Sequence, residues 1–248
     1  MDAPLDEFLL PDQKEKVIDR VGQGNTRGIQ FANQTSGLYE MQIHALRDAI
    51  NQTDYSESVR IMIPNIRTAE EVAKTKAMVS DLMDGKEFEF GVMVETLDAV
   101  ENIKPIAEQC HFISFGTNDL TAEVMGNINR VDYDAISKWM MDNDVQGETP
   151  FKQLIPQVLN QMQIAIDDAR EVNPNIHISG CGHQFGVDSK AADVALSMGF
   201  NAVSIPNMKF YTMRLMSAYH ANSGAFSNNK DAKPKRVHSS SSVGLVLK

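Results

Sequence analysis

The chain has 248 residues, of which 42% are hydrophobic and 23% charged, and its formal net charge is −10 at pH 7. This balance is typical of a globular protein with a sizeable core. The acidic charge argues against general binding to nucleic acid or to anionic membrane surfaces. Because no run approaches the roughly 20 apolar residues of a membrane span, we expect neither nucleic acid nor a membrane as a partner.

The two cysteines, Cys110 and Cys181, are too few for a disulfide framework and fit a reducing compartment. Each has a histidine close by, at His111 and His183, but no second Cys/His pair at close spacing accompanies either one, so we do not expect zinc. The N-terminal segment is acidic and lacks a signal-peptide pattern. These features predict a cytoplasmic protein.

Short apolar runs alternate with longer helical patterns along the chain. The runs are apolar on both faces, as expected for parallel strands covered by helices; they span residues 27–31, 59–66, 88–95, 111–116, 176–182 and 202–206. Helices are predicted at 68–83, 98–109, around 136–141, at 155–171 and at 187–200. Repeated strand–helix units of this kind indicate a parallel α/β fold.

Local signals refine these elements. Thr68 and Glu71 have the spacing of a capping box, Pro105 should kink or interrupt its helix, and Gly199 is placed to end the last one. Residues 223–248 are polar and rich in Ser and Lys, so we expect a disordered tail after a domain spanning residues 1–222.

Three of the predicted strands end on, or run into, residues that could bind a metal ion or an anion or transfer a proton. One ends at Glu95, one runs into Gly116-Thr117-Asn118-Asp119, and one ends at Cys181. Since the carboxyl ends of parallel strands share one edge, these side chains could converge on one pocket. Two carboxylates suit Mg²⁺, glycine lets backbone N–H groups approach an anion, and a thiol beside them could move a proton.

Each of these residues also has a simpler interpretation. A carboxylate at a strand end is often a helix cap or a surface charge, and Asn-Asp after Gly-Thr is ordinary turn chemistry. A cysteine is often just buried, as we expect of Cys110. Only the occurrence of all three features together favours a functional site.

At these positions the sequence resembles the phosphoenolpyruvate-utilising enzymes, and among them the pyruvate phosphate dikinases most closely. The resemblance rests on GVMVETLDA (91–99), FISFGTNDLTAE (112–123) and SGCGHQFG (179–186), in that order, and it extends from about residue 3 to about residue 220. It implies a (β/α)8 TIM barrel of the PEP/pyruvate type, truncated on its N-terminal side, with about six strand–helix units present.

The resemblance also implies roles for individual residues. Glu95 and Asp119 would hold Mg²⁺, and Cys181 would be the catalytic acid that protonates the enolate of pyruvate. Phosphoenolpyruvate or pyruvate would be contacted by Glu95, Gly116, Thr117, Asn118, Asp119 and Arg27. Phosphoryl transfer in this family goes to a histidine on a separate domain.

The sequence departs from the family pattern in several places. Two substrate arginines of the first two barrel strands, the nucleotide-binding domain and the phosphohistidine domain have no counterpart here. His183 stands where the family usually has a glutamate, and Arg130 lies one position away from the expected place of another substrate arginine. Arg27 could supply part of the missing positive charge or form an ion pair within the scaffold.

Three functions therefore stay open. The first is the C-terminal part of a dikinase-like phosphotransferase that needs an upstream polypeptide with phosphohistidine and ATP-binding domains, with a homodimer as one candidate assembly. The second is a non-catalytic relic or binding module. The third, less favoured by the order of the motifs, is a free-standing Mg²⁺-dependent lyase of the PEP/pyruvate barrel group.

Overall fold

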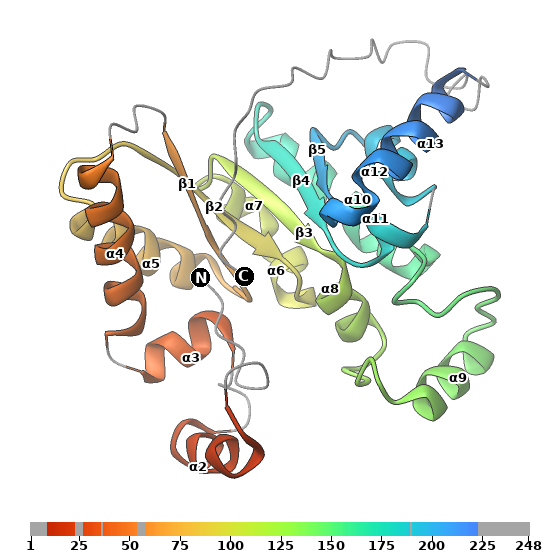
Figure 1. Ribbon diagram of the computed structural model, residues 1–248, viewed down its shortest axis with the longest axis horizontal. Coiled ribbons are helices and arrows are strands. Elements are labelled where there is room, and N and C mark those ends of the chain that lie inside the picture. The colour runs from red at the N-terminus through yellow and green to blue at the C-terminus, as the bar shows by residue number, and fades with distance from the viewer. Residues whose placement is uncertain (1–8, 23–26, 36, 54–57, 189, 223–248) are drawn as a thin grey trace.

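The computed structural model of the protein describes residues 9–22, 27–35, 37–53, 58–188 and 190–222. They form an α/β domain around a sheet of five strands (Figure 1). The strands lie side by side in chain order, and each of the four pairs is parallel. Their bounds are Val59–Ile63 (β1), Phe88–Val94 (β2), Phe112–Gly116 (β3), His177–Cys181 (β4) and Ala202–Ser204 (β5).

The described helices precede, connect and follow these strands (Figure 1). They are α2 (Pro11–Val21), α3 (Gly28–Gln34), α4 (Leu38–Gln52), α5 (Ala69–Leu82), α6 (Leu97–Glu101), α7 (Ile103–Ala107), α8 (Thr117–Val124), α9 (Tyr133–Asp142), α10 (Pro156–Val172), α11 (Gln184–Val187), α12 (Ala191–Ser197), the 3₁₀ helix η2 (Asn207–Lys209) and α13 (Phe210–Asn222). Within the described ranges, none of them is long and apolar enough to cross a membrane.

The strand order is that of a singly wound sheet. Crossovers between parallel strands are right-handed, so strands that follow one another in a single direction receive their helices on one face. A doubly wound sheet instead reverses direction and carries helices on both faces. The order β1 to β5 therefore belongs to part of a β/α barrel and confirms the predicted α/β class. Among the described residues β1 and β5 are edges, so the sheet stays open.

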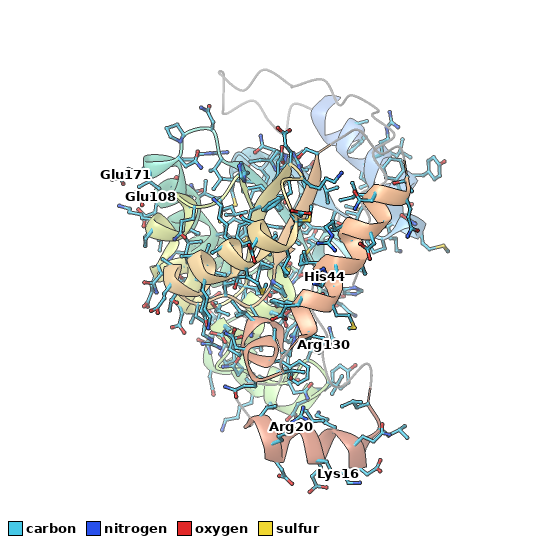
Figure 2. All side chains as sticks on the ribbon, turned by 90° about the vertical axis from the view of Figure 1, so that its left-hand side faces the viewer. Lys16, Arg20, His44, Glu108, Arg130 and Glu171 are labelled. Atoms are coloured by element: carbon cyan, nitrogen blue, oxygen red, sulfur yellow. The ribbon has the colours of Figure 1, made fainter. Side chains whose placement is uncertain are left out.

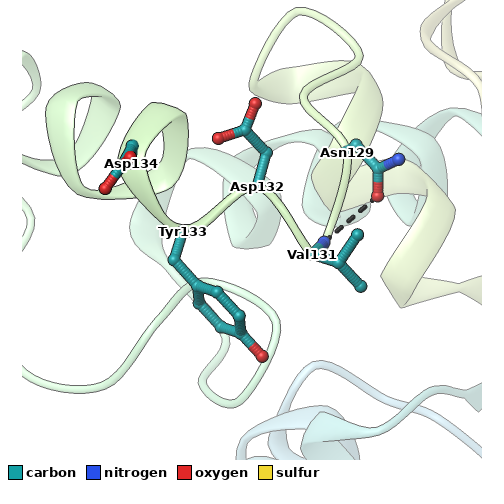
Figure 3. Close-up of a pocket in the computed structure, with 5 residues that line it drawn as sticks. All are labelled: Asn129, Val131, Asp132, Tyr133 and Asp134. Carbon is teal, nitrogen blue, oxygen red and sulfur yellow. Dashed lines mark hydrogen bonds between the residues drawn. The ribbon is translucent and has the colours of Figure 1, made fainter.

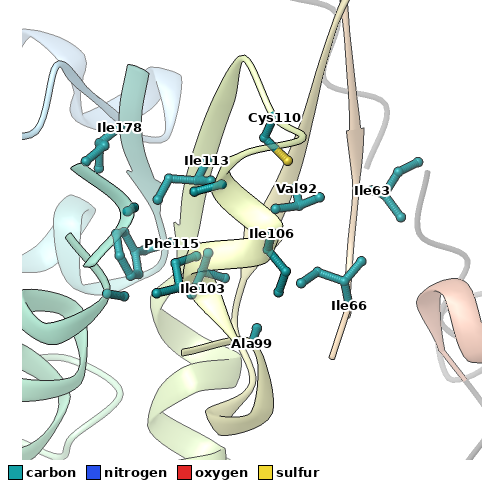
Figure 4. Packing of buried hydrophobic residues seen from close by; sticks show 14 of the residues in the cluster. Ile63, Ile66, Val92, Ala99, Ile103, Ile106, Cys110, Ile113, Phe115 and Ile178 are labelled. Atoms are coloured by element: carbon teal, nitrogen blue, oxygen red, sulfur yellow. The ribbon is translucent and has the colours of Figure 1, made fainter. Parts of the chain in front are cut away.

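The main core lies between one face of the sheet and the helices. Val92, Phe115 and Ile178 from three neighbouring strands are fully buried there, together with Ile103 and Ile106 of α7 (Figure 4). Burying one such side chain stabilises a fold by roughly 2 kcal/mol. This packing fixes the orientation of the strands and therefore decides which residues point to the opposite face.

The opposite face of the sheet, called the second face below, carries small, polar and sulfur-containing side chains together with the aromatic ring of Phe112. By strand alternation and register its members are Arg60, Met62, Glu89, Gly91, Met93, Phe112, Ser114, Gly116, His177, Ser179, Cys181, Ala202 and Ser204. Near the amino ends of the strands, Arg60 Nε lies 2.5 Å from Glu89 Oε2, and its guanidinium lies 5.6 Å from the centre of the Phe112 ring. The second face is therefore polar at both ends of the strands.

Helix α5 confirms the predicted capping box. Thr68 Oγ1 accepts the backbone N–H of Glu71 at 3.2 Å, and Glu71 Oε2 accepts the backbone N–H of Thr68 at the same distance. Two N–H groups that the first turn would leave unpaired are satisfied in this way.

The predicted helix at 98–109 is divided into α6 and α7. The division lies at Asn102 and not at Pro105 itself, which belongs to the first turn of α7. Proline has no N–H to donate, and its ring clashes with the carbonyl four residues earlier, here that of Glu101. The break therefore lies one turn before the proline.

The strand predicted at 27–31 is wrong, because this segment begins helix α3. Ile29 packs into the main core, whereas Phe31 packs into a smaller cluster with Val21 of α2. Apolar residues that serve two different clusters produce a short run that resembles a buried strand, and periodicity cannot tell a strand from a helix over so few residues. The sheet consequently has five described strands where six were expected. The tail predicted at 223–248 lies outside the described residues.

We expect the capping box to contribute measurably to stability. Replacing Thr68 with alanine removes an N-cap acceptor and should lower the free energy of unfolding by about 1 kcal/mol. Urea unfolding followed by circular dichroism measures this change. Ser80→Ala, at an exposed position inside the same helix, is the control and should leave stability unchanged or slightly higher, because alanine favours helix interiors. Equal effects of the two substitutions would contradict the capping role.

Candidate functional site

Three of the predicted site residues stand in one row at the carboxyl end of the sheet. Gly116 on β3 pairs in register with Cys181 on β4, and Val94 pairs with Phe115, which places Glu95 beside Gly116. In-register neighbours project to the same face of a sheet. Glu95 and Cys181 therefore belong to the second face, two strand spacings apart, or on the order of 10 Å between their Cα atoms.

Gly116 lets Glu95 come close to the middle of this row. A Cβ atom at position 116 would lie 2.9 Å from both Glu95 Cβ and Met93 Cε, and it would collide with Glu95 Oε2. Only glycine avoids these contacts. The carboxylate of Glu95 thus lies against the backbone of β3.

A backbone donor holds the carboxylate of Glu95 in this position. Glu95 is 2% exposed, and its Oε1 accepts the N–H of Asn65 at 2.7 Å. Asn65 has a φ of 54° in the loop after β1 and is held by Gln30 of α3, whose amide nitrogen donates to the Asn65 carbonyl at 2.9 Å. A second bond runs from the Asn65 side-chain nitrogen to Gln30 Oε1 at 2.7 Å. Helix α3 therefore fixes Glu95 through this loop.

Asp119, the other predicted metal ligand, forms an ion pair with Arg27. Arg27 Nη1 lies 2.8 Å from Asp119 Oδ1, and Nη2 lies 3.4 Å from Oδ2, so the guanidinium bonds both oxygens. The two side chains are 39% and 40% exposed. The predicted scaffold ion pair of Arg27 is therefore present, and it involves a residue of the candidate site.

Helix α8 begins directly where β3 ends, so the predicted turn is the first turn of a helix. Gly116 is its N-cap, and Thr117, Asn118 and Asp119 are its first three residues. No side chain of the described residues caps this end. Because the first N–H groups of a helix have no partner within the helix, this terminus is suited to an anion.

The side chain of Thr117 faces inward from this terminus. Its hydroxyl is fully buried, 2.8 Å from Gln184 Oε1 and 3.1 Å from the carbonyl oxygen of Cys181. The Gln184 amide nitrogen continues the network to Thr121 Oγ1 at 3.3 Å and to the Pro150 carbonyl at 3.1 Å. Thr117 thus joins the start of α8 to the segment after β4, and only its backbone is placed to meet a ligand.

Asn118 and Gly182 complete the junction between α8 and the segment after β4. Asn118 Oδ1 accepts the backbone N–H of His183 at 3.1 Å. Gly182 has a φ of 149°, and a Cβ atom there would collide with the hydroxyl of Thr117. The close contact of these two segments keeps Cys181 next to the start of α8.

The two cysteines lie in different environments. Cys181 is half-buried, whereas Cys110 is buried next to α7. Burial raises the pKa of the Cys110 thiol to about 12, and the positive charge of Lys76 offsets this only in part. Cys110 therefore stays a protonated thiol at neutral pH, which confirms its expected role in the core.

The donors present fit a hard divalent cation that the protein holds through few ligands. Among the described residues, no three His, Cys, Asp or Glu side chains gather in one group. Glu95 and Asp119 offer carboxylate oxygens just after the ends of the neighbouring strands β2 and β3. Mg²⁺ often takes one or two carboxylates and completes its shell with water and ligand oxygens.

Several contacts around the site join segments far apart in the chain, so no local sequence pattern indicates them. The roles of Asn65, Gln30 and Gln184 depend on contacts between segments 30 to 67 residues apart. Arg130 is exposed between α8 and α9 (Figure 2) and has no ion pair with any described residue. A shallow hollow lined by residues 129 and 131–134 lies at the start of α9 and includes none of the predicted site residues (Figure 3).

Fold and site together define an α/β domain of barrel type with a carboxylate, a helix N-terminus and a thiol at the carboxyl ends of its strands. The family described as PEP-utilising enzyme, PEP-binding domain, matches residues 16–221. Because this match covers most of the chain, the protein belongs to that family.

The chain is also similar to several curated pyruvate, phosphate dikinases. It is 30% identical over 219 residues to that of Rickettsia bellii, covering 75% of this chain and 25% of the relative. It is 27% identical over 230 residues to that of Entamoeba histolytica (86% and 25%), and 27% identical over 252 residues to pyruvate, phosphate dikinase 2 of Zea mays (88% and 28%). The chain thus spans about a quarter of the length of these relatives.

Two solved structures show a distant likeness. RipC from Yersinia pestis gives a TM-score of 0.46 at 13% identity, covering 71% of this chain and 69% of that one. A citrate lyase from Burkholderia xenovorans LB400 gives 0.49 at 17% identity, covering 83% and 64%. Likenesses at this level carry no weight for the function of the chain.

The two thiols should differ in reactivity towards a thiol-specific disulfide reagent. At pH 8 we expect one thiol per chain to react quickly, because Cys181 is half-buried, and the second to react only after unfolding, since the raised pKa of Cys110 leaves almost no thiolate. Absorbance of the released reagent measures the two phases. Cys181→Ser should remove the fast phase and Cys110→Ser should keep it; the reverse result would contradict the placement of both residues.

Proposed function

We propose that the domain binds phosphoenolpyruvate or pyruvate with Mg²⁺ and interconverts pyruvate and its enolate. The row of Glu95, Gly116 and Cys181, with Asp119 three residues further along, is the observation that carries the proposal. Membership of the PEP-binding family supports the class of ligand.

The residues of the row divide the chemistry between them. Glu95 and Asp119 would hold the cation, which when bound offsets the negative charge that develops on the ligand oxygens. The N–H groups at the start of α8, which no side chain of the described residues caps, would bind the carboxylate of the ligand. The sulfur of Cys181 would take a proton from the methyl carbon of pyruvate to leave the enolate, and return it in the reverse direction.

The phosphoryl-transfer part of the reaction would need further polypeptide. The curated relatives are about four times as long as the segment that matches them. We propose that an upstream polypeptide supplies the phosphohistidine and the ATP-binding domain of a dikinase-like phosphotransferase. Among the described residues the outer edges of β1 and β5 have no neighbouring strand, which supports this proposal because exposed strand edges tend to pair with another segment.

Calorimetric titration with Mg²⁺ and oxalate, a mimic of the enolate, tests the binding site. After subtraction of the Mg²⁺–oxalate association recorded without protein, we expect tight binding only when both are present. Glu95→Gln and Asp119→Asn should each lose affinity roughly 100-fold, because each removes a charged ligand. Glu123→Gln is the matched control: it removes the same charge from α8, where Glu123 pairs with Arg67, and should bind normally. Unchanged affinity in the first two variants would refute the assignment of the carboxylates.

Exchange of the pyruvate methyl protons tests the proton transfer without any phosphoryl donor. In D₂O with Mg²⁺ we expect the methyl proton NMR signal of pyruvate to decay through reversible enolate formation. Cys181→Ser should slow the exchange at least 100-fold, since a general acid–base group contributes about that factor or more; Cys110→Ser should not. Binding of oxalate without exchange in the wild-type chain would instead favour the non-catalytic binding module.

A further inference from the structure

Helix α3 is linked to both candidate metal ligands. Arg27, the residue that precedes its first turn, bonds the two oxygens of Asp119. Gln30, one turn later, holds Asn65, whose N–H bonds Glu95. One short helix thus sets the surroundings of two carboxylates that come from different strand ends.

The bidentate ion pair competes with a cation for Asp119. A carboxylate oxygen has lone pairs to spare beyond the one that a guanidinium N–H uses, so steric occupation alone does not exclude a metal. The cation and the Arg27 guanidinium would still repel each other, because a divalent cation on Asp119 would lie within a few ångströms of the permanent positive charge of the guanidinium. The Arg27 guanidinium should therefore weaken the binding of a cation that arrives alone.

An anionic ligand would relieve this opposition. The planar guanidinium presents parallel N–H donors that match a carboxylate or a phosphate as well as they match Asp119. The side chains of Arg27 and Asp119 are both more than one-third exposed, so a ligand can reach the ion pair from solvent. An anion bound next to the cation would give the guanidinium a new hydrogen-bond acceptor when Asp119 binds the cation.

We propose that Arg27 exchanges partners, from Asp119 to the anionic ligand, and so makes binding of the cation and of the anion cooperative. This inference rests on the proposed function, because it uses the same two carboxylates. Arg27 acts in it as a positioning residue for Asp119 and as a contact for the ligand. The consequence is a site that binds either ligand weakly alone and both tightly together.

Titrations of the full chain with Mg²⁺ alone, and with Mg²⁺ at saturating oxalate, measure this coupling, after subtraction of the Mg²⁺–oxalate association recorded without protein. In Arg27→Gln we expect affinity for Mg²⁺ alone to rise several-fold and the enhancement by oxalate to fall about tenfold, within the usual range of coupling between sites. Arg67→Gln is the matched control, because Arg67 has the same 39% exposure and pairs with Asp98 and Glu123. It should change neither quantity.

The outcomes separate this inference from the proposed function. If the wild-type chain binds Mg²⁺ with oxalate and Arg27→Gln leaves both quantities unchanged, partner exchange is refuted while the binding site stands. If the wild-type chain shows no heat with both ligands, both proposals fail. Should Arg27→Gln fail to fold by circular dichroism, Arg27→Lys decides: it keeps the charge and loses the planar fork, so Mg²⁺ affinity should stay low while the enhancement by oxalate falls.

Discussion

The structure depends on one constraint, the in-register pairing of β3 with its neighbours β2 and β4. This register puts Glu95, Gly116 and Cys181 in a single row although 86 residues separate the first from the last. A shift of one residue in either strand pair would turn one of these side chains into the core. The buried side chains on the opposite face, Val92, Phe115 and Ile178 among them, prevent that shift. Core packing and site geometry are thus set by the same alternation.

The close approach at Gly116 links this register to the chemistry. With no side chain at that position, the Glu95 carboxylate lies against β3, and the helix that begins at Thr117 starts within the row. Around this centre each site residue has a hydrogen-bond partner of its own. Asn65 fixes Glu95, Arg27 bonds Asp119, and Gln184 holds Thr117. A buried polar group needs such hydrogen-bond partners, and the partner of Glu95 also orients it for a ligand.

The sequence predicted the elements that follow from short-range physics. Strands buried on both faces and a capping box are visible within a few residues, as at Thr68 and Glu71. It also placed Glu95 and Cys181 at one edge, because parallel strands end together. It failed where one segment serves two cores, as Ile29 and Phe31 do. It predicted that Pro105 interrupts its helix, but not that the break lies one turn earlier, at Asn102. It could not foresee Asn65 or Gln184, whose roles exist only through contacts between distant segments.

The chain belongs to the PEP-binding family and spans about a quarter of the length of its curated relatives, and the proposed ligand site rests on the row of Glu95, Gly116 and Cys181. The most direct test of the central claim is a crystal structure of the chain with Mn²⁺ and oxalate, located by anomalous scattering. We expect one manganese peak within coordination distance, about 2.0–2.3 Å, of oxygens from both Glu95 and Asp119, with oxalate between that ion and Cys181. A peak bound elsewhere, or one that touches neither carboxylate, would contradict the account.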